Sequence, residues 1–133
     1  MSIRQFEEIE GWKEARTLAT KIYEIANRGR FSADFGLRDQ IRRAAVSTMA
    51  NIAEGFGRGG KAELIRFLRI SRACALENQS HLYIALDLGY LSSADFEAVH
   101  TQAIKVTRLV GGFINYLSGY EEPNNRSTEQ PSN

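Results

Sequence analysis

The segment from Ala44 to Ala53 carries no charged side chain, although the residues around it follow the pattern of an amphipathic helix. Over roughly three helical turns, its polar side chains are only Ser47, Thr48 and Asn51. A helix on the surface of a monomer normally presents a strongly polar or charged face to water. We therefore expect this helix to be enclosed, either by its own bundle or by another copy of the chain.

The composition indicates one domain built from long helices. The chain has 133 residues, enough for a single domain with a sizeable core. Both prolines, Pro123 and Pro131, lie in the last eleven residues, so none interrupts the rest of the chain. Cys74 is the only cysteine, which excludes an internal disulfide and favours a reducing, cytoplasmic location. We expect no signal peptide and no membrane association, because no apolar run is long enough to span a bilayer.

Hydrophobic residues recur at helical spacing in four segments. The pattern predicts helices over residues 10–27, 37–55, 61–88 and from a capping box at Ser92 and Asp95 to Leu117. The short loops between them favour antiparallel neighbours. The predicted fold class is therefore all-α, an antiparallel up-down-up-down four-helix bundle.

The remaining segments are interpreted as connections and a tail. Residues 28–36 are expected to be a connection, and Gly89 is a natural residue just past a helix end. We expect the bundle domain to cover residues 1–120. Residues 121–133 have no aliphatic or aromatic side chain to bury and are predicted to be a disordered tail.

The glycine-rich segment from Gly55 to Gly60 matches the pattern G-x-G-x-x-G. That pattern binds a dinucleotide only when a strand precedes it and a helix N-terminus faces the pyrophosphate. Here a helix precedes it, so we interpret the segment as a turn between helices. Arg58 and Lys61 lie beside the next helix start, where a phosphate of a larger ligand remains conceivable.

Residues able to support catalysis or bind a metal are few. His81 and His100 are the two histidines, and no second Glu-x-x-His motif completes a two-metal bundle site. Cys74 lies on the same predicted helix as Glu77 and His81, where one short span cannot bring a nucleophile, a base and an acid together. We therefore expect no metal, no cofactor and no enzymatic activity.

A row of polar side chains follows one face of the second predicted helix. Its members step by three and four residues and span an arc of roughly 80°. They are Gln40, Arg43, Ser47, Asn51, Glu54 and Arg58. Such a row is either a solvated face or a polar ladder packed against a neighbouring chain. We favour the interface, because solvated faces usually carry lysine and glutamate and polar residues at helix interfaces fix register.

Basic side chains are concentrated in the middle of the chain. Residues 38–72 contain eight basic and three acidic side chains, whereas the whole chain has a net charge of only +1. Arg66, Arg69 and Arg72 are predicted to form a stripe on the third helix. A single stripe is usually a solvated face, but repeated around a symmetric oligomer it becomes a ring of positive potential for phosphates. No aromatic platform accompanies it, so sequence-specific binding is not expected.

The second helix and its surroundings resemble a known family. The pattern Gln40-x-x-Arg43-Ala44-Ala45-x-Ser47-x-x-x-Asn51-Ile52-Ala53-Glu54-Gly55-x-Gly57-Arg58 resembles the signature of small four-helix-bundle proteins encoded in intervening sequences of bacterial large-subunit ribosomal RNA genes. Arg66-Phe67-Leu68-x-Ile70-Ser71, Leu88-Gly89-Tyr90-Leu91 and Trp12-x-x-Ala15 resemble further segments of that family. The resemblance covers about residues 6–118.

The resemblance implies an assembly and a class of partner. Related accessory variability proteins of diversity-generating retroelements form five-fold barrels, bind nucleic acid with little sequence preference and engage a reverse transcriptase. The implied protein is a ring-shaped homo-oligomer, a pentamer, that contacts RNA or DNA phosphates through Arg58, Lys61, Arg66, Arg69 and Arg72. The alternative is a scaffold for a protein partner such as a reverse transcriptase. Gln40, Arg43, Ser47, Asn51 and Glu54 are the expected oligomer interface or structural polar ladder.

Overall fold

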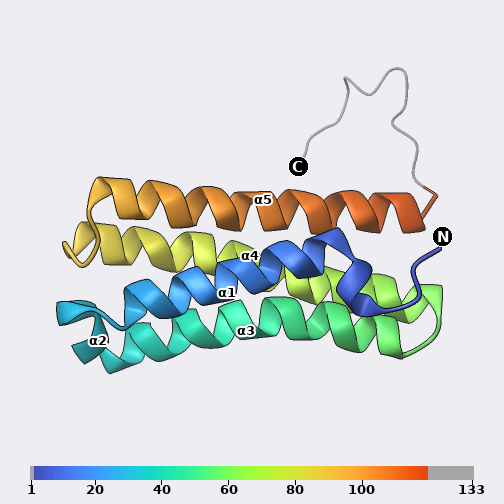
Figure 1. Cartoon of the computed structure of the whole chain (residues 1–133), viewed down its shortest axis with the longest axis horizontal. Coiled ribbons are helices and arrows are strands. Elements are labelled where there is room, and N and C mark those ends of the chain that lie inside the picture. The colour runs from blue at the N-terminus through green and yellow to red at the C-terminus, as the bar shows by residue number, and fades with distance from the viewer. Residues whose placement is uncertain (1, 120–133) are drawn as a thin grey trace, which may run out of the picture.

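A computed structural model describes residues 2–119 of the chain (Figure 1). It contains a short 3₁₀ helix and five α-helices, with no strand among those residues. In chain order they are η1 (Phe6–Glu8), α1 (Glu10–Ala26), α2 (Gly29–Ala33), α3 (Phe35–Gly57), α4 (Lys61–Asp87) and α5 (Ser93–Leu117). The prediction of an all-α fold is confirmed. The predicted tail, residues 121–133, lies outside the described residues.

Four long helices run alternately in opposite directions (Figure 1). Helices α1 and α4 each pack against both α3 and α5. The core comes from the side chains that recur at helical spacing, such as Ile22 on α1, Ile52 on α3, Leu82 on α4 and Val106 on α5, all fully buried. The expected up-down-up-down arrangement follows from the short connections, which leave each helix beside the one it follows.

Residues 28–36, expected to be a connection, contain the extra helix α2. Its Phe31 is fully buried and stacks on Tyr90, with ring centroids 5.3 Å apart. Asp34, which follows α2, accepts hydrogen bonds from the Leu37 backbone amide at 3.2 Å and the Tyr90 hydroxyl at 2.8 Å. This connection therefore closes one end of the bundle and caps α3.

The other predicted helix ends are placed within two residues. Helix α3 continues past Gly55 to Gly57, and the turn follows at Gly59, whose φ is +87°. The predicted cap at Ser92 is present, since its hydroxyl oxygen accepts a hydrogen bond from the Asp95 amide at 3.0 Å. The Asp95 carboxylate does not complete the expected capping box; it accepts a bond from Arg28 at 3.0 Å.

Buried polar side chains tie α3 to α4. Asn78, which is fully buried, donates to the Ile41 carbonyl oxygen at 2.9 Å, and the Ser71 hydroxyl donates to the Thr48 carbonyl oxygen at 2.6 Å. A buried polar group is costly unless it is hydrogen-bonded, so sliding α4 along α3 would break both bonds. These bonds fix the register in which the two helices present their outer faces. No helix in residues 2–119 combines the length and apolar character needed to cross a bilayer.

Candidate interaction surface on α3 and α4

The predicted polar row lies on the outer side of α3. Gln40, Arg43 and Glu54 are exposed, and Ser47 and Asn51 are half-buried, whereas Ile41, Ala45, Thr48 and Ile52 on the opposite side are buried. The row makes bonds along its own helix. The Asn51 side-chain amide donates to the Ser47 carbonyl oxygen at 2.8 Å, and Arg58 pairs with Glu54 at 3.2 Å. Its role as an oligomer interface stays a prediction.

The uncharged segment 44–53 is covered on one side only. Ala44, Ala45, Thr48 and Ile52 are buried by the bundle. Outward from them, Ala50 is exposed and Val46 retains 43% of its accessible surface. The bundle therefore encloses the inner half of this segment and leaves an uncharged outer half facing away from it.

The outer side of α4 changes character along its length. Its first half carries Arg66 and Arg69, both exposed, with Ile70 at 38% beside them. Its second half exposes large apolar side chains at 45–50%: Leu76, Tyr83 and Ile84 on the helix and Leu88 directly after its end. We call these four residues the apolar half of α4. Exposed apolar side chains that gather on one surface mark an interaction site more often than scattered single ones do, and here the exposed Glu77 and Asp87 share the same stretch of helix.

The sequence reasoning did not find the apolar half of α4. The helix also carries a complete inner stripe, which includes Leu64, Leu68 and Leu82, all buried. Apolar residues on both sides of one helix hide the boundary between core and surface positions. The available signal is that residues 76, 83 and 84 fall outside the spacing of that inner stripe.

Two of the predicted phosphate-binding arginines already have acidic partners. Arg66 donates to both carboxylate oxygens of Glu63, at 3.1 and 3.2 Å, and Arg58 pairs with Glu54. The hydrogen bond from Arg66 is the main reason that the pKa of Glu63 lies below its usual value. Both guanidinium groups also lie over the ring of Phe67, at 5.0 Å for Arg58 and 4.6 Å for Arg66. The structure therefore brings Arg58 and Arg66 together, and their positive charge is partly neutralised by Glu54 and Glu63.

The other three cations have no such partner. Among the described residues, no carboxylate lies within 4.0 Å of Lys61, Arg69 or Arg72. Arg72 is half-buried and lies against α5, with its Nη1 atom 3.7 Å from the position of a Cβ at Gly111. Arg66 and Arg69 are exposed, whereas Arg72 is turned towards α5.

Gly55 allows α3 and α4 to come together at the start of this surface. A Cβ at residue 55 would lie 2.6 Å from the Cβ of Phe67 and 3.3 Å from a methyl group of Leu64. No side chain fits there without moving a helix. This contact explains the glycine within the Asn-Ile-Ala-Glu-Gly motif, and Gly59 and Gly60, after the end of α3, lie in the interhelical turn that the sequence predicted.

The histidines and the cysteine do not assemble a chemical site. His100 stacks on Phe96, with centroids 4.7 Å apart. Burial raises the pKa of the Cys74 thiol, with a further contribution from Glu77, which is opposite to the shift of an activated nucleophile. Within residues 2–119, no three side chains of His, Cys, Asp or Glu are grouped so as to hold a metal ion.

The fold and its surfaces define a helical-bundle protein whose distinguishing residues lie on the outer sides of two adjacent helices. The sequence model of the family described as 23S rRNA-intervening sequence protein matches residues 7–112. The chain belongs to this family.

A solved structure agrees with the fold. A protein of unknown function from the S23 ribosomal protein family of Bacteroides thetaiotaomicron VPI-5482 is similar, with a TM-score of 0.71 and 21% sequence identity. The similarity covers 78% of this chain and 97% of that one. A comparison with curated proteins gives no match. At this identity, the structural likeness supports the bundle fold.

Proposed function

We propose that the protein is a non-enzymatic accessory protein that assembles into a ring-shaped homopentamer and binds RNA or DNA with little sequence preference. The main observation in support is that the outer side of α4 has a basic half and an apolar half. A cytoplasmic location belongs to this proposal.

The apolar half of α4 and the uncharged outer half of α3 support the assembly. Leu76, Ile84 and Val46 each keep between 43% and 48% of their surface exposed in the protomer. Covering apolar surface stabilises an association by about 25 cal/mol for each Å² removed from water. In a closed ring, each protomer contributes two different patches, one to each neighbour. The polar row on α3 would set the register of that contact.

The basic half of α4 supports binding to phosphates. Residues 54–72 contain five basic and two acidic side chains. Repeated around a ring, these cations would form a continuous band of positive potential. Lys61, Arg69 and Arg72 are the first candidates for contacts with phosphates. Arg58 and Arg66 would have to break their ion pairs with Glu54 and Glu63 before they could bind a phosphate.

The assembly is tested by light scattering coupled to gel filtration. We expect about five times the 14.9 kDa chain mass for the native protein. Ile84→Glu should lower that mass, because a charge buried at an interface is costly unless it is paired. Thr101→Glu, at an exposed position of α5, is the matched control and should leave the mass unchanged. A monomeric native protein would contradict the ring.

Nucleic-acid binding is tested by a salt series with DNA duplexes of two unrelated sequences. The slope of log K against log salt should be about −2.7 if a single protomer of the ring contacts phosphates through three cations, about −4.5 if it does so through all five, and steeper in proportion if further protomers take part. The affinity should hardly depend on base sequence. A flat salt dependence would refute phosphate binding.

The second candidate function is a scaffold for a protein partner such as a reverse transcriptase, without direct nucleic-acid binding. The pairing of Arg58 with Glu54 and of Arg66 with Glu63 favours it, since these ion pairs reduce the net positive charge available to phosphates. A ring that forms normally but does not retain DNA at low salt would support this function over the first.

A further inference from the structure

The bundle is incomplete at the end where the N-terminal segment lies. The first turn of α1 meets α5 at Val110, whose side chain is 3.2 Å from the position of a Cβ at Gly11. Helix α5 continues to Leu117, which is about 10 Å further at 1.5 Å per residue. Over that distance α1 is replaced by η1 and the extended residues before it (Figure 1). The last two turns of α5 therefore lack the neighbour that the rest of α5 has.

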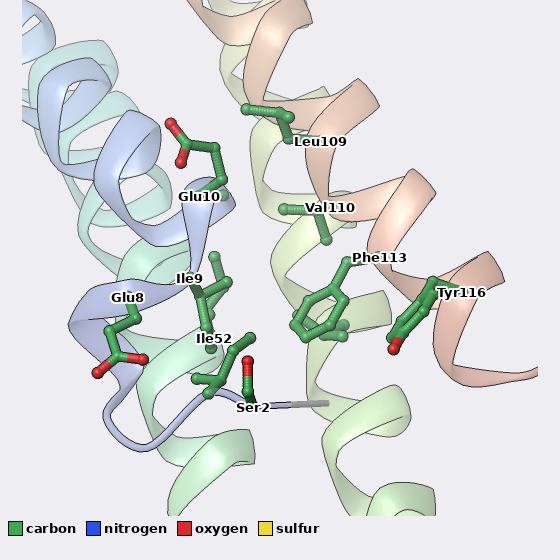
Figure 2. A pocket seen from close by; sticks show the side chains of 12 residues that line it. Ser2, Glu8, Ile9, Glu10, Ile52, Leu109, Val110, Phe113 and Tyr116 are labelled. Carbon is green, nitrogen blue, oxygen red and sulfur yellow. The ribbon is translucent and has the colours of Figure 1, made fainter.

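A cavity of about 480 Å³ lies in this place. Its inner wall combines apolar side chains from three helices and the residue before α1: Ile52 on α3, Leu68 on α4, Val110 on α5 and Ile9. Figure 2 shows Ile9, Ile52, Val110 and Phe113 converging on the same space. The cavity thus reaches side chains that belong to the core.

The opening of the cavity combines an aromatic side chain with two carboxylates. Tyr116 is 62% exposed and stacks on Phe113, with ring centroids 6.4 Å apart. Glu8 and Glu10 are the charged residues among its described lining, which includes no lysine or arginine. Glu8 accepts a bond from the Arg4 backbone amide at 3.2 Å, and Glu10 lies 3.9 Å from the Lys13 ammonium. Both carboxylates are exposed and can accept further partners.

We propose that this cavity docks a short amphipathic helix of a partner polypeptide, with apolar side chains inside and lysine or arginine over Glu8 and Glu10. The occupant is helical because the cavity continues the line of α1 beside α5, with the residues before α1 forming one of its walls. It is basic because the described lining offers negative charge only. An exposed tyrosine beside an apolar cavity is typical of residues that dominate binding energy in helix-in-groove complexes. The site lies apart from the apolar half of α4 and does not depend on the proposed ring.

The test uses two fluorescently labelled peptides, each about 14 residues or roughly four helical turns long. They share leucines at the same positions of one face and carry either lysine or glutamate on the other. Fluorescence anisotropy with the full chain should give a Kd at least about tenfold lower for the lysine peptide. Glu8→Gln combined with Glu10→Gln should reduce that difference to about threefold or less, and Tyr116→Ala should weaken binding of the lysine peptide.

Matched control variants distinguish binding in the cavity from non-specific binding to other exposed carboxylates and aromatic rings. Glu24→Gln with Glu97→Gln removes two exposed carboxylates elsewhere, and Phe35→Ala removes an equally exposed aromatic ring at the start of α3. These variants should bind the lysine peptide as the native chain does. Equal effects from the control and cavity variants would overturn the proposal, as would equal affinity of the native chain for both peptides.

Photo-crosslinking locates the peptide even if a cavity variant fails to fold. A benzophenone on the leucine face should attach to the native chain at Phe113, Tyr116 or the residues around Ile9. Attachment on α4 beyond Leu76 would overturn the proposal. A fall in the mass of the assembly on peptide binding would also overturn it, because a second copy would then be the natural occupant.

Discussion

Replacing Gly55 by alanine tests the contact that holds α3 against α4. The added Cβ would lie 2.6 Å from the Cβ of Phe67, about 1 Å closer than two carbon atoms pack without repulsion. The atom it meets is attached directly to the backbone of α4 and cannot rotate away. Leu64 closes the remaining space, with a methyl group at 3.3 Å and its carbonyl oxygen at 3.4 Å. One helix must therefore move.

The expected magnitude follows from two opposing effects. Overpacking a well-filled contact costs about 1–3 kcal/mol, and occasionally more. Alanine in place of glycine inside a helix contributes about 1 kcal/mol of stabilisation. The contact at Gly55 lies at the severe end because the opposing atom is rigid. We expect the free energy of unfolding to fall by about 1–2 kcal/mol net.

Urea denaturation at a fixed protein concentration measures this change. Gly112→Ala is the matched control, since residue 112 is an exposed position within α5 and a Cβ there would meet nothing within 4 Å. The control should raise the free energy of unfolding by about 0.5–1 kcal/mol. If Gly55→Ala stabilises the protein as the control does, the helices are not in the close contact described, and the structural reason for the motif glycine is wrong.

Two further predictions concern side chains that connect distant elements. Asn78→Ala removes a buried bond to the Ile41 carbonyl oxygen and should cost about 1–3 kcal/mol in urea denaturation, whereas Asn115→Ala, at an exposed position, should change stability by less than about 0.5 kcal/mol. The hydrogen bond to Asp34 raises the pKa of Tyr90 above its usual 10.0. The stability that Tyr90 gains over Tyr90→Phe should therefore be present below pH 10.0 and be lost as the pH rises through the folded pKa; a difference that stays constant from pH 8 to pH 11 would contradict this.

The four long helices were predictable because each buries a stripe that repeats over several turns. Ala45 and Ile52 on α3 are examples, and both are fully buried. Helix α2 was not predictable in this way, since its five residues make little more than one turn and contain no repeat. It is held by tertiary contacts of Phe31 with Tyr90, which the order of residues along the chain does not reveal.

The candidate surface was only partly predictable. The Glu54–Arg58 pair follows from the spacing of four residues along one helix, and the Glu63–Arg66 pair follows from a spacing of three. The packing of Arg72 against α5 depends on a neighbour that comes nearly forty residues later, beside Gly111. The cavity at the N-terminal end depends on where α1 begins relative to α5, and no spacing within one segment encodes that relation.

Two residues of the family signature on α3 differ in their reason from Val46 and Ala50, which stand at unspecified positions of that signature. Ile52 and Gly55 are needed inside the protomer, one to fill the core and the other to admit α4. Val46 and Ala50 contribute less to the protomer, because Val46 keeps 43% of its surface exposed and Ala50 is exposed as well. Lysine or glutamate at these two positions would improve solubility without disturbing the core. The proposed assembly would cover this uncharged outer face, so assembly is the property of this chain to measure before any ligand is sought.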